Sequence, residues 1–124
     1  MITYLFKKGK GIIMANKYLN FKWELGEEKV YVTISQYQNG NIYVGLGPDF
    51  CNITVNIKKL NHWEGAIDTP NVPELADFLE SNEIATDTLK RVQSGFNTYP
   101  IYKFSRRRLS ELNKKELQIY LDNC

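Results

Sequence analysis

The feature that most constrains the fold of this chain is a period-two alternation of apolar and polar residues from Tyr18 to Lys58. The alternation falls into four stretches, which the turn-forming sequences GEEK, QNGN and GPDFCN separate. Because successive side chains of a strand point to opposite faces, each stretch presents one apolar face. The pattern predicts four half-buried strands joined as an antiparallel meander. The apolar sets are Leu19, Phe21, Trp23 and Leu25; Val30, Val32 and Ile34; Ile42, Val44 and Leu46; and Ile53, Val55 and Ile57.

The Asn39-Gly40 turn sets the register between the second and third of these strands. A two-residue loop would pair Ile34 with Gly45 and place the apolar faces of the two strands on opposite sides. A loop longer by one residue pairs Ile34 with Leu46, and Gly40 can take the left-handed conformation that such a loop needs. We therefore expect a three-residue loop with a bulge.

Helical signals begin after Leu60. In NVPELADFLESN, Asn71 and Glu74 have the spacing of a capping box, and Pro73 suits a first turn. These residues predict a short helix near 73–81, with Asn82 as its C-terminal cap. Its apolar stripe consists of Leu75, Phe78 and Leu79.

A second capping box, Asn113 with Glu116, predicts a helix near 114–121, and Leu112 and Leu117 are spaced as its hydrophobic staple. Between the two helices, EIATDTLKRVQ is ambiguous and compatible with an added helical turn. Residues 99–104 have strand periodicity, but Pro100 restricts them to an edge strand or a strand start. The sequence therefore predicts an α+β fold, in which two short helices pack on one face of an antiparallel meander of four to five strands.

The first 13 residues, MITYLFKKGKGII, do not follow the order of a secretion signal, because the apolar residues precede the lysines. The codons for Lys-Gly-Lys-Gly are purine-rich, and they lie a short distance before Met14, as a ribosome-binding site lies before a start codon. We expect residues 1–13 to be a translated leader with Met14 as the natural start; a mobile basic arm is the alternative. Residues 14–124 are expected to form a single domain.

Composition argues against several classes of protein. The net charge of +2 is far below that of a dedicated nucleic-acid-binding protein. Two cysteines, Cys51 and Cys124, are too few for a disulfide framework and indicate free thiols in a cytoplasmic protein. No apolar run approaches the roughly 20 residues of a membrane span, so no membrane partner is expected.

Candidate catalytic groups are few. His62 is the only histidine, and Cys51 with His62 is the only formal nucleophile and base pair. No phosphate-binding glycine loop is present, because GLGPDF has proline where a helix would have to begin. We predict that the protein is not an enzyme and that it uses neither a metal nor a cofactor.

Charge is distributed unevenly along the chain. Between Leu60 and Leu89 there are acidic residues but no lysine or arginine, and from Lys90 onward basic residues dominate. The bland interpretation is two ordinary solvated faces, and the functional one is a pair of docking patches of opposite sign. For the second interpretation the predicted partner-binding residues are Glu74, Asp77, Glu80, Glu83, Arg106, Arg107 and Arg108.

The arginine triplet also supports a different hypothesis. Guanidinium groups bind phosphates and carboxylates in a bidentate manner, and aromatic rings nearby can stack on bases. The alternative set of nucleic-acid-binding residues is Lys103, Arg106, Arg107, Arg108 and Tyr99.

Residues 64–104 resemble domain-of-unknown-function family 4313, a family of small proteins found on bacterial mobile elements and phages. The pattern SGFNTYPIYKF looks architectural, with SGF as a tight turn that buries Phe96. One departure is Leu89, where the family pattern has glycine after Thr88. The matching positions are Ala66, Ile67, Asp68, Thr69, Asn71, Pro73, Phe78, Leu79, Thr88, Ser94, Gly95, Phe96, Tyr99, Pro100, Tyr102 and Phe104.

The resemblance implies a context, because small accessory proteins of mobile elements often block host defence machinery. We therefore expect a binding module that acts as a stoichiometric, anti-CRISPR-like inhibitor through contact with a host defence protein or nuclease complex. The alternative is an accessory protein that binds nucleic acid through the Arg106–Arg108 cluster. The sequence leaves the oligomeric state open.

Overall fold

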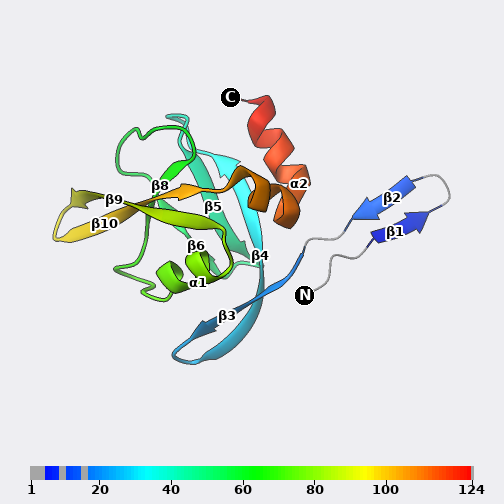
Figure 1. Cartoon of the computed structure of the whole chain (residues 1–124), viewed down its shortest axis with the longest axis horizontal. Helices are drawn as coiled ribbons and strands as arrows, with labels where there is room; N and C mark the ends of the chain where they lie inside the picture. Colours follow the sequence, from blue (N-terminus) through cyan, green and yellow to red (C-terminus); the bar gives the residue numbers. More distant parts are fainter. Residues whose placement is uncertain (1–4, 9–10, 15–16, 124) are drawn as a thin grey trace.

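A computed structural model describes residues 5–8, 11–14 and 17–123 of the chain. It confirms an α+β fold with antiparallel sheets (Figure 1). The elements are β1 (Leu5–Lys8), β2 (Gly11–Met14), β3 (Leu19–Trp23), β4 (Gly26–Gln36), β5 (Ile42–Gly47), β6 (Cys51–Asn52), β7 (Thr54–Val55), β8 (Glu64–Ile67), α1 (Leu75–Ser81), β9 (Ala85–Ser94), β10 (Asn97–Phe104) and α2 (Arg106–Asp122).

The strands of the main body form two four-stranded sheets instead of the single meander that the alternation predicts. The first sheet has the order β3-β4-β5-β6 and the second has the order β7-β8-β10-β9. The chain changes sheets at Ile53, whose N–H donates to the carbonyl of Val44 at 2.9 Å. Ile53 and Thr54 are both buried, because they lie where the two sheets meet. Alternation defines which face of a strand is apolar but not the sheet to which it belongs, so the fourth predicted strand is divided between them.

The β4–β5 hairpin has the predicted three-residue loop, residues 38–40, closed by the N–H of Tyr37 and the carbonyl of Asn41 at 2.9 Å. Gly40 has a φ of 95° in this loop. The predicted register is wrong by two residues, because Ile34 pairs with Val44 and not with Leu46. Both registers keep the apolar faces in phase, so the alternation does not distinguish them.

The segment 83–93 contributes to β9 instead of adding a helical turn, and β9 pairs with β10 as a hairpin. β10 lies between β8 and β9, so the prediction of an edge strand is wrong, and Pro100, the fourth residue of β10, is not at the start of the strand either. The pairing of β8 with β10 begins only at Ile101. Pro100 therefore faces no partner in β8, and its missing N–H costs no ladder hydrogen bond on that side.

A bulge interrupts β9. Ile101 pairs with Lys90 and Tyr102 pairs with Asp87, so Thr88 and Leu89 are extra residues on the β9 side. The Thr88 hydroxyl donates to the carbonyl of Ile101 at 2.6 Å. Leu89 takes a left-handed φ of 70° and leaves 80% of its surface exposed. Glycine, which the resemblance leads us to expect at this position, adopts such a φ without steric cost.

Helix α1 lacks the predicted capping box. Its N-cap is Glu74, which makes no side-chain capping hydrogen bond. The Asn71 amide instead donates to the Asp68 carboxylate at 3.1 Å, which occupies the side chain in the preceding loop. The C-terminal cap is Asn82, as predicted, and its amide donates to the carbonyl of Phe78 at 2.9 Å.

Helix α2 begins earlier than predicted, at Arg106, because Ser105 caps it by accepting a hydrogen bond from the Arg108 N–H at 3.1 Å. The helix breaks at Asn113, where φ is −158° and ψ is 75°. Half of the predicted capping box forms there, since the side-chain Oδ1 of Asn113 accepts from the N–H of Glu116 at 3.2 Å. The Glu116 carboxylate instead accepts from the N–H of Ile34 on β4 at 2.8 Å.

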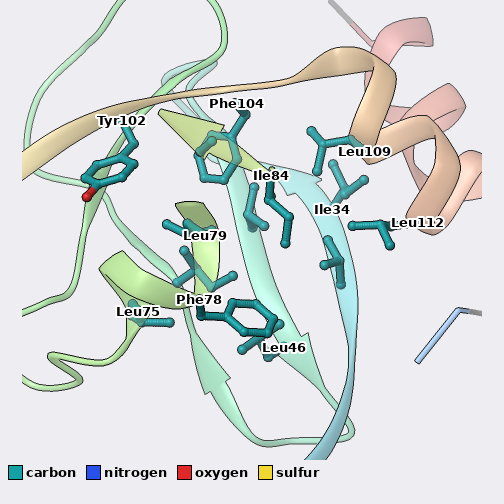
Figure 2. Close-up of a cluster of buried hydrophobic side chains, with 14 of the residues drawn as sticks. Ile34, Leu46, Leu75, Phe78, Leu79, Ile84, Tyr102, Phe104, Leu109 and Leu112 are labelled. Carbon is teal, nitrogen blue, oxygen red and sulfur yellow. The ribbon is translucent and has the colours of Figure 1, made fainter. Parts of the chain in front are cut away.

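One hydrophobic core joins both sheets and both helices (Figure 2). The two helices contribute to this same core, and a smaller cluster around Ala66, Val92 and Ile101 is separate from it. The labelled core side chains in Figure 2 are Ile34, Leu46, Leu75, Phe78, Leu79, Ile84, Tyr102, Phe104, Leu109 and Leu112.

The predicted leader, residues 1–13, lies partly outside the described residues, and its origin stays a prediction. Its described parts belong to β1 and β2, which pair with each other from Leu5 with Met14 to Lys8 with Gly11.

Leu89→Gly is expected to raise the free energy of unfolding by about 0.5–1 kcal/mol. The substitution removes a left-handed leucine, which costs about 1–2 kcal/mol. Part of this gain is offset because glycine raises the conformational entropy of the unfolded chain. Denaturant unfolding measures the change. Leu25→Gly is the matched control, since Leu25 is equally exposed at 76% but does not have a positive φ. An equal effect of the two substitutions would contradict backbone strain at Leu89.

Glu116→Ala is expected to lower the free energy of unfolding by about 1–3 kcal/mol, because it leaves the N–H of Ile34 without an acceptor. Glu116→Gln keeps an acceptor oxygen and is expected to restore most of the stability. Lys115→Ala, at an exposed neighbour on the same helix, controls for helix propensity. Thermal and denaturant unfolding of the three variants gives the comparison; equal stability of the Ala and Gln variants would show that the hydrogen bond contributes little.

Candidate functional site

Four carboxylates form an acidic surface on and around α1: Glu74, Asp77, Glu80 and Glu83. The opposite side of the helix is buried in the core through Leu75, Phe78 and Leu79, which turns the carboxylates outward. Asp77, Glu80 and Glu83 are exposed and Glu74 is half-buried. Among the described residues, no lysine or arginine forms an ion pair with any of the four.

Glu80 differs from the other three because it has a partner inside the fold. The Tyr102 hydroxyl donates to the Glu80 carboxylate at 2.6 Å. Burial raises the pKa of Tyr102 well above its usual value, and the hydrogen bond to Glu80 raises it further. The pair joins α1 to β10, so Glu80 acts first as a structural anchor.

The arginine triplet is divided by the structure. Arg107 and Arg108 both pair with Glu111, at 2.7 and 3.0 Å respectively. The Arg108 Nε also donates to the carbonyl of Asn82 at 2.8 Å, and only 17% of the Arg108 side chain is exposed. Arg108, followed by Arg107, lowers the pKa of the Glu111 carboxyl. Two of the three predicted arginines therefore form ion pairs within α2, and Arg108 also joins α2 to the end of α1.

Arg106 is exposed, like Arg107, but has no ion pair among the described residues; its guanidinium carbon lies 6.0 Å from the centre of the Trp63 ring. The Trp63 ring in turn makes an edge contact with Tyr120 at 5.6 Å. The spacing of Glu111, three and four residues after Arg108 and Arg107, is the sequence signal for intrahelical ion pairs that would have separated Arg106 from the other two.

The remaining members of the alternative set, Tyr99 and Lys103, lie on one face of β10. Because pairing partners share a face, Lys90, opposite Ile101, lies on that face too. A cavity of about 430 Å³ at this face has four cationic residues in its lining. We call it the basic cavity; its residues are Lys58, Lys59, Leu60, Asn61, Glu64, Lys90, Arg91 and Ile101.

Only part of the charge in the basic cavity is neutralised. Lys90 pairs with the buried carboxylate of Glu64 at 2.8 Å, and Arg91 pairs with Asp87 at 3.0 Å. Lys58 and Lys59 have no ion pair within the described part of the chain. Sequence reasoning missed these two lysines because it followed the longer acidic and basic windows and not this adjacent pair.

Phe96 occupies the tip of the β9–β10 hairpin. Ser94 pairs with Asn97, which leaves Gly95 and Phe96 as the two-residue turn. The prediction that SGF buries Phe96 is wrong, because its ring is fully exposed. In Figure 1 this hairpin projects from the body of the molecule, so the tip carries a large apolar side chain into solvent.

The formal nucleophile and base pair has no activated member. Burial, and then the charge of Asp68, raises the pKa of the Cys51 thiol to about 11, so little thiolate is present at neutral pH. His62 is exposed. No cluster of three or more histidine, cysteine or acidic side chains with metal-binding geometry occurs within residues 5–8, 11–14 and 17–123. Neither helix in this part of the chain is long and apolar enough to cross a membrane.

No curated protein matches the chain, and no solved structure does. A family model matches residues 31–124, from β4 to the end of α2 and beyond. This match spans the acidic surface, the basic cavity and the hairpin tip. The chain belongs to the family described as domain of unknown function DUF4313.

Proposed function

We propose that this protein is a non-catalytic binding module that acts by occupying the surface of a protein partner, with the acidic surface as its contact region. The observation that carries the proposal is a contrast in pairing. Asp77 and Glu83 are exposed and have no basic partner among the described residues, whereas Arg107 and Arg108 are both paired with Glu111. The charge left available for a partner on α1 and the turn after it is therefore acidic, and Arg106 is the member of the triplet without an ion pair in the described part of the chain.

The acidic surface is also held rigidly. The Tyr102–Glu80 hydrogen bond fixes α1 to β10, and the Arg108 guanidinium fixes the end of α1 to α2. A preorganised surface loses little conformational entropy when it binds. Unpaired carboxylates on such a surface speed association with a basic partner and orient it.

The exposed ring of Phe96 offers an apolar contact to a partner, which the carboxylates of the acidic surface do not. Binding energy at protein interfaces concentrates in a few large side chains that enter pockets on the partner. A phenylalanine at a hairpin tip has few competing contacts within its own chain. Phe96 is therefore our candidate anchor residue for the same partner.

The finer proposal concerns the partner. The context implied by the family resemblance is a mobile element, and the predicted partner is a host defence protein or nuclease complex. The nucleic-acid channel of a nuclease is rich in arginine and lysine, which complements an acidic surface. The protein then acts as a stoichiometric inhibitor, with one molecule silencing about one molecule of partner and no turnover.

The double variant Asp77→Lys/Glu83→Lys is expected to weaken the complex at least tenfold, because it replaces attraction by repulsion at both positions. The measurement is the dissociation constant with the partner captured from the host, together with the equivalents of protein needed for full inhibition. Glu80 is left unchanged because its hydrogen bond to Tyr102 contributes to the fold.

Lys114→Glu/Lys115→Glu is the control, since both lysines are exposed on α2. Like the test variant, it reverses two surface charges, but it does so outside the acidic surface. It should leave the complex and the melting temperature nearly unchanged. Inactivation of a large excess of target by a trace of protein, with a covalent change in the target, would contradict a binding mechanism.

A second candidate function, nucleic-acid binding, is favoured by the basic cavity together with Tyr99 and Lys103 on the adjoining face of β10. Lys58 and Lys59 are exposed and unpaired in the described part of the chain, and Tyr99 and Lys103 lie on the adjoining face. This set differs from the one based on the arginine triplet, in which two members share the single carboxylate of Glu111.

If nucleic acid is the ligand, the affinity should fall steeply with salt, because phosphate contacts release counterions. Lys58→Ala/Lys59→Ala/Lys103→Ala should reduce the salt slope by roughly one for each phosphate that the variant no longer neutralises. Arg107→Ala/Arg108→Ala is the comparison variant and should change the slope less. No binding to single- or double-stranded DNA or RNA at low salt would remove this candidate.

A further inference from the structure

A cavity of about 310 Å³ adjoins the acidic surface, between the end of β3, the loop at Phe50 and the segment that leads into α1. Glu74 belongs both to the acidic surface and to the lining of this cavity. We call it the aromatic pocket; its residues are Phe21, Trp23, Glu24, Phe50, Cys51, Asn71, Val72, Pro73 and Glu74.

Three aromatic rings form the apolar part of the pocket and hold one another in place. Phe50 makes edge contacts with Phe21 at 5.2 Å and with Trp23 at 5.6 Å. Phe21 is completely buried and also contacts Phe78 of α1 at 5.1 Å. Trp23 and Phe50 are only half-buried, so the rings on the solvent side are supported from beneath by the core.

The charge of the pocket has one sign. Glu24 is exposed and Glu74 is half-buried, and the lining contains no lysine, arginine or histidine. Neither carboxylate forms an ion pair within the residues that the structure describes. Aromatic rings attract cations through the negative charge of their faces, and the two carboxylates add to that attraction.

From this combination we propose that the aromatic pocket binds an arginine side chain of the protein partner. Arginine fits better than lysine because its planar guanidinium stacks on aromatic rings, is weakly hydrated and binds a carboxylate in a bidentate manner. The planar face of the guanidinium contacts the rings, and its N–H groups donate to the carboxylates. The inference rests on the proposed function, because the aromatic pocket would add one specific contact to the binding of a basic partner by the acidic surface.

The pocket contains its own spectroscopic reporter. The indole N–H of Trp23 is buried and has no hydrogen-bond partner among the described residues. Its resonance should respond to a ligand in the pocket, and a Trp63→Phe variant assigns it, because Trp23 and Trp63 are the two tryptophans of the chain.

The test is a titration of the full chain with N-acetyl-arginine amide, followed through this resonance. We expect a saturable shift, and no saturable shift with N-acetyl-citrulline amide, which has the same shape but no charge. Glu24→Gln/Glu74→Gln should weaken the binding of the arginine probe about tenfold, because two charge-assisted contacts become neutral ones. Glu83→Gln, a change in the acidic surface outside the pocket, should leave it unchanged.

Three results would overturn the proposal: no saturable shift at the solubility limit of the probe, an equal response to citrulline, or equal weakening in the Glu24/Glu74 and Glu83 variants. These results are separable from failure of the proposed function. If the Asp77/Glu83 charge reversal weakens the partner complex while the probe does not bind, the binding module stands and the arginine pocket is wrong. If the probe binds as expected but the partner complex ignores the charge reversal, the pocket stands and the assigned docking surface is wrong.

Discussion

The arrangement of the molecule depends on how the open edge of β4 is closed. β3 pairs with β4 only from Gly26 to Val30, which leaves the following part of this edge without a neighbouring strand. Side chains of α2 replace the missing strand: the Asn113 amide donates to the carbonyl of Val32 at 2.8 Å, and Glu116 accepts from Ile34. Because this edge lies against the core, unpaired backbone groups here would be costly. The break in α2 lies at Asn113, and it allows the Asn113 side chain to reach the backbone of β4.

This edge contact positions the surfaces that we propose for function. With α2 fixed against β4, its first turn lies beside the end of α1, where Arg108 reaches the carbonyl of Asn82. Helix α1 is in turn joined to β10 of the second sheet by the hydrogen bond from Tyr102 to Glu80. The contacts thus run from the edge of β4 to α2, from α2 to the end of α1, and from α1 to β10 of the second sheet. Together they position the carboxylates of the acidic surface.

The sequence predicted several features that depend on neighbours in the chain: the alternation of the strands, the three-residue length of the β4–β5 loop but not its position, the apolar stripe of α1 and the cap at Asn113. It did not predict features that depend on distant partners. The division into two sheets at Ile53 arises because buried faces meet there, and Pro100 is tolerated because β8 stops short of it. For the candidate site, Asp77 and Glu80 were correctly located on α1, and Tyr99 and Lys103 on β10, but the arginine triplet was not located on a helix. The availability of the charges was not predicted either, because an ion pair reduces the charge that is counted along the sequence.

Because of these ion pairs, the net charge of +2 does not describe the charge that is available on each surface for binding a partner. Four of the basic residues after Leu89 have carboxylate partners: Lys90 with Glu64, Arg91 with Asp87, and Arg107 and Arg108 with Glu111. The first two pairs use carboxylates from the acidic window, so folding neutralises the two charge windows partly against each other. Asp77 and Glu83 remain on and after α1 without an ion pair in the described part of the chain, and the aromatic pocket adjoins them. We therefore propose that a partner meets a negative surface there, although the chain as a whole is positive.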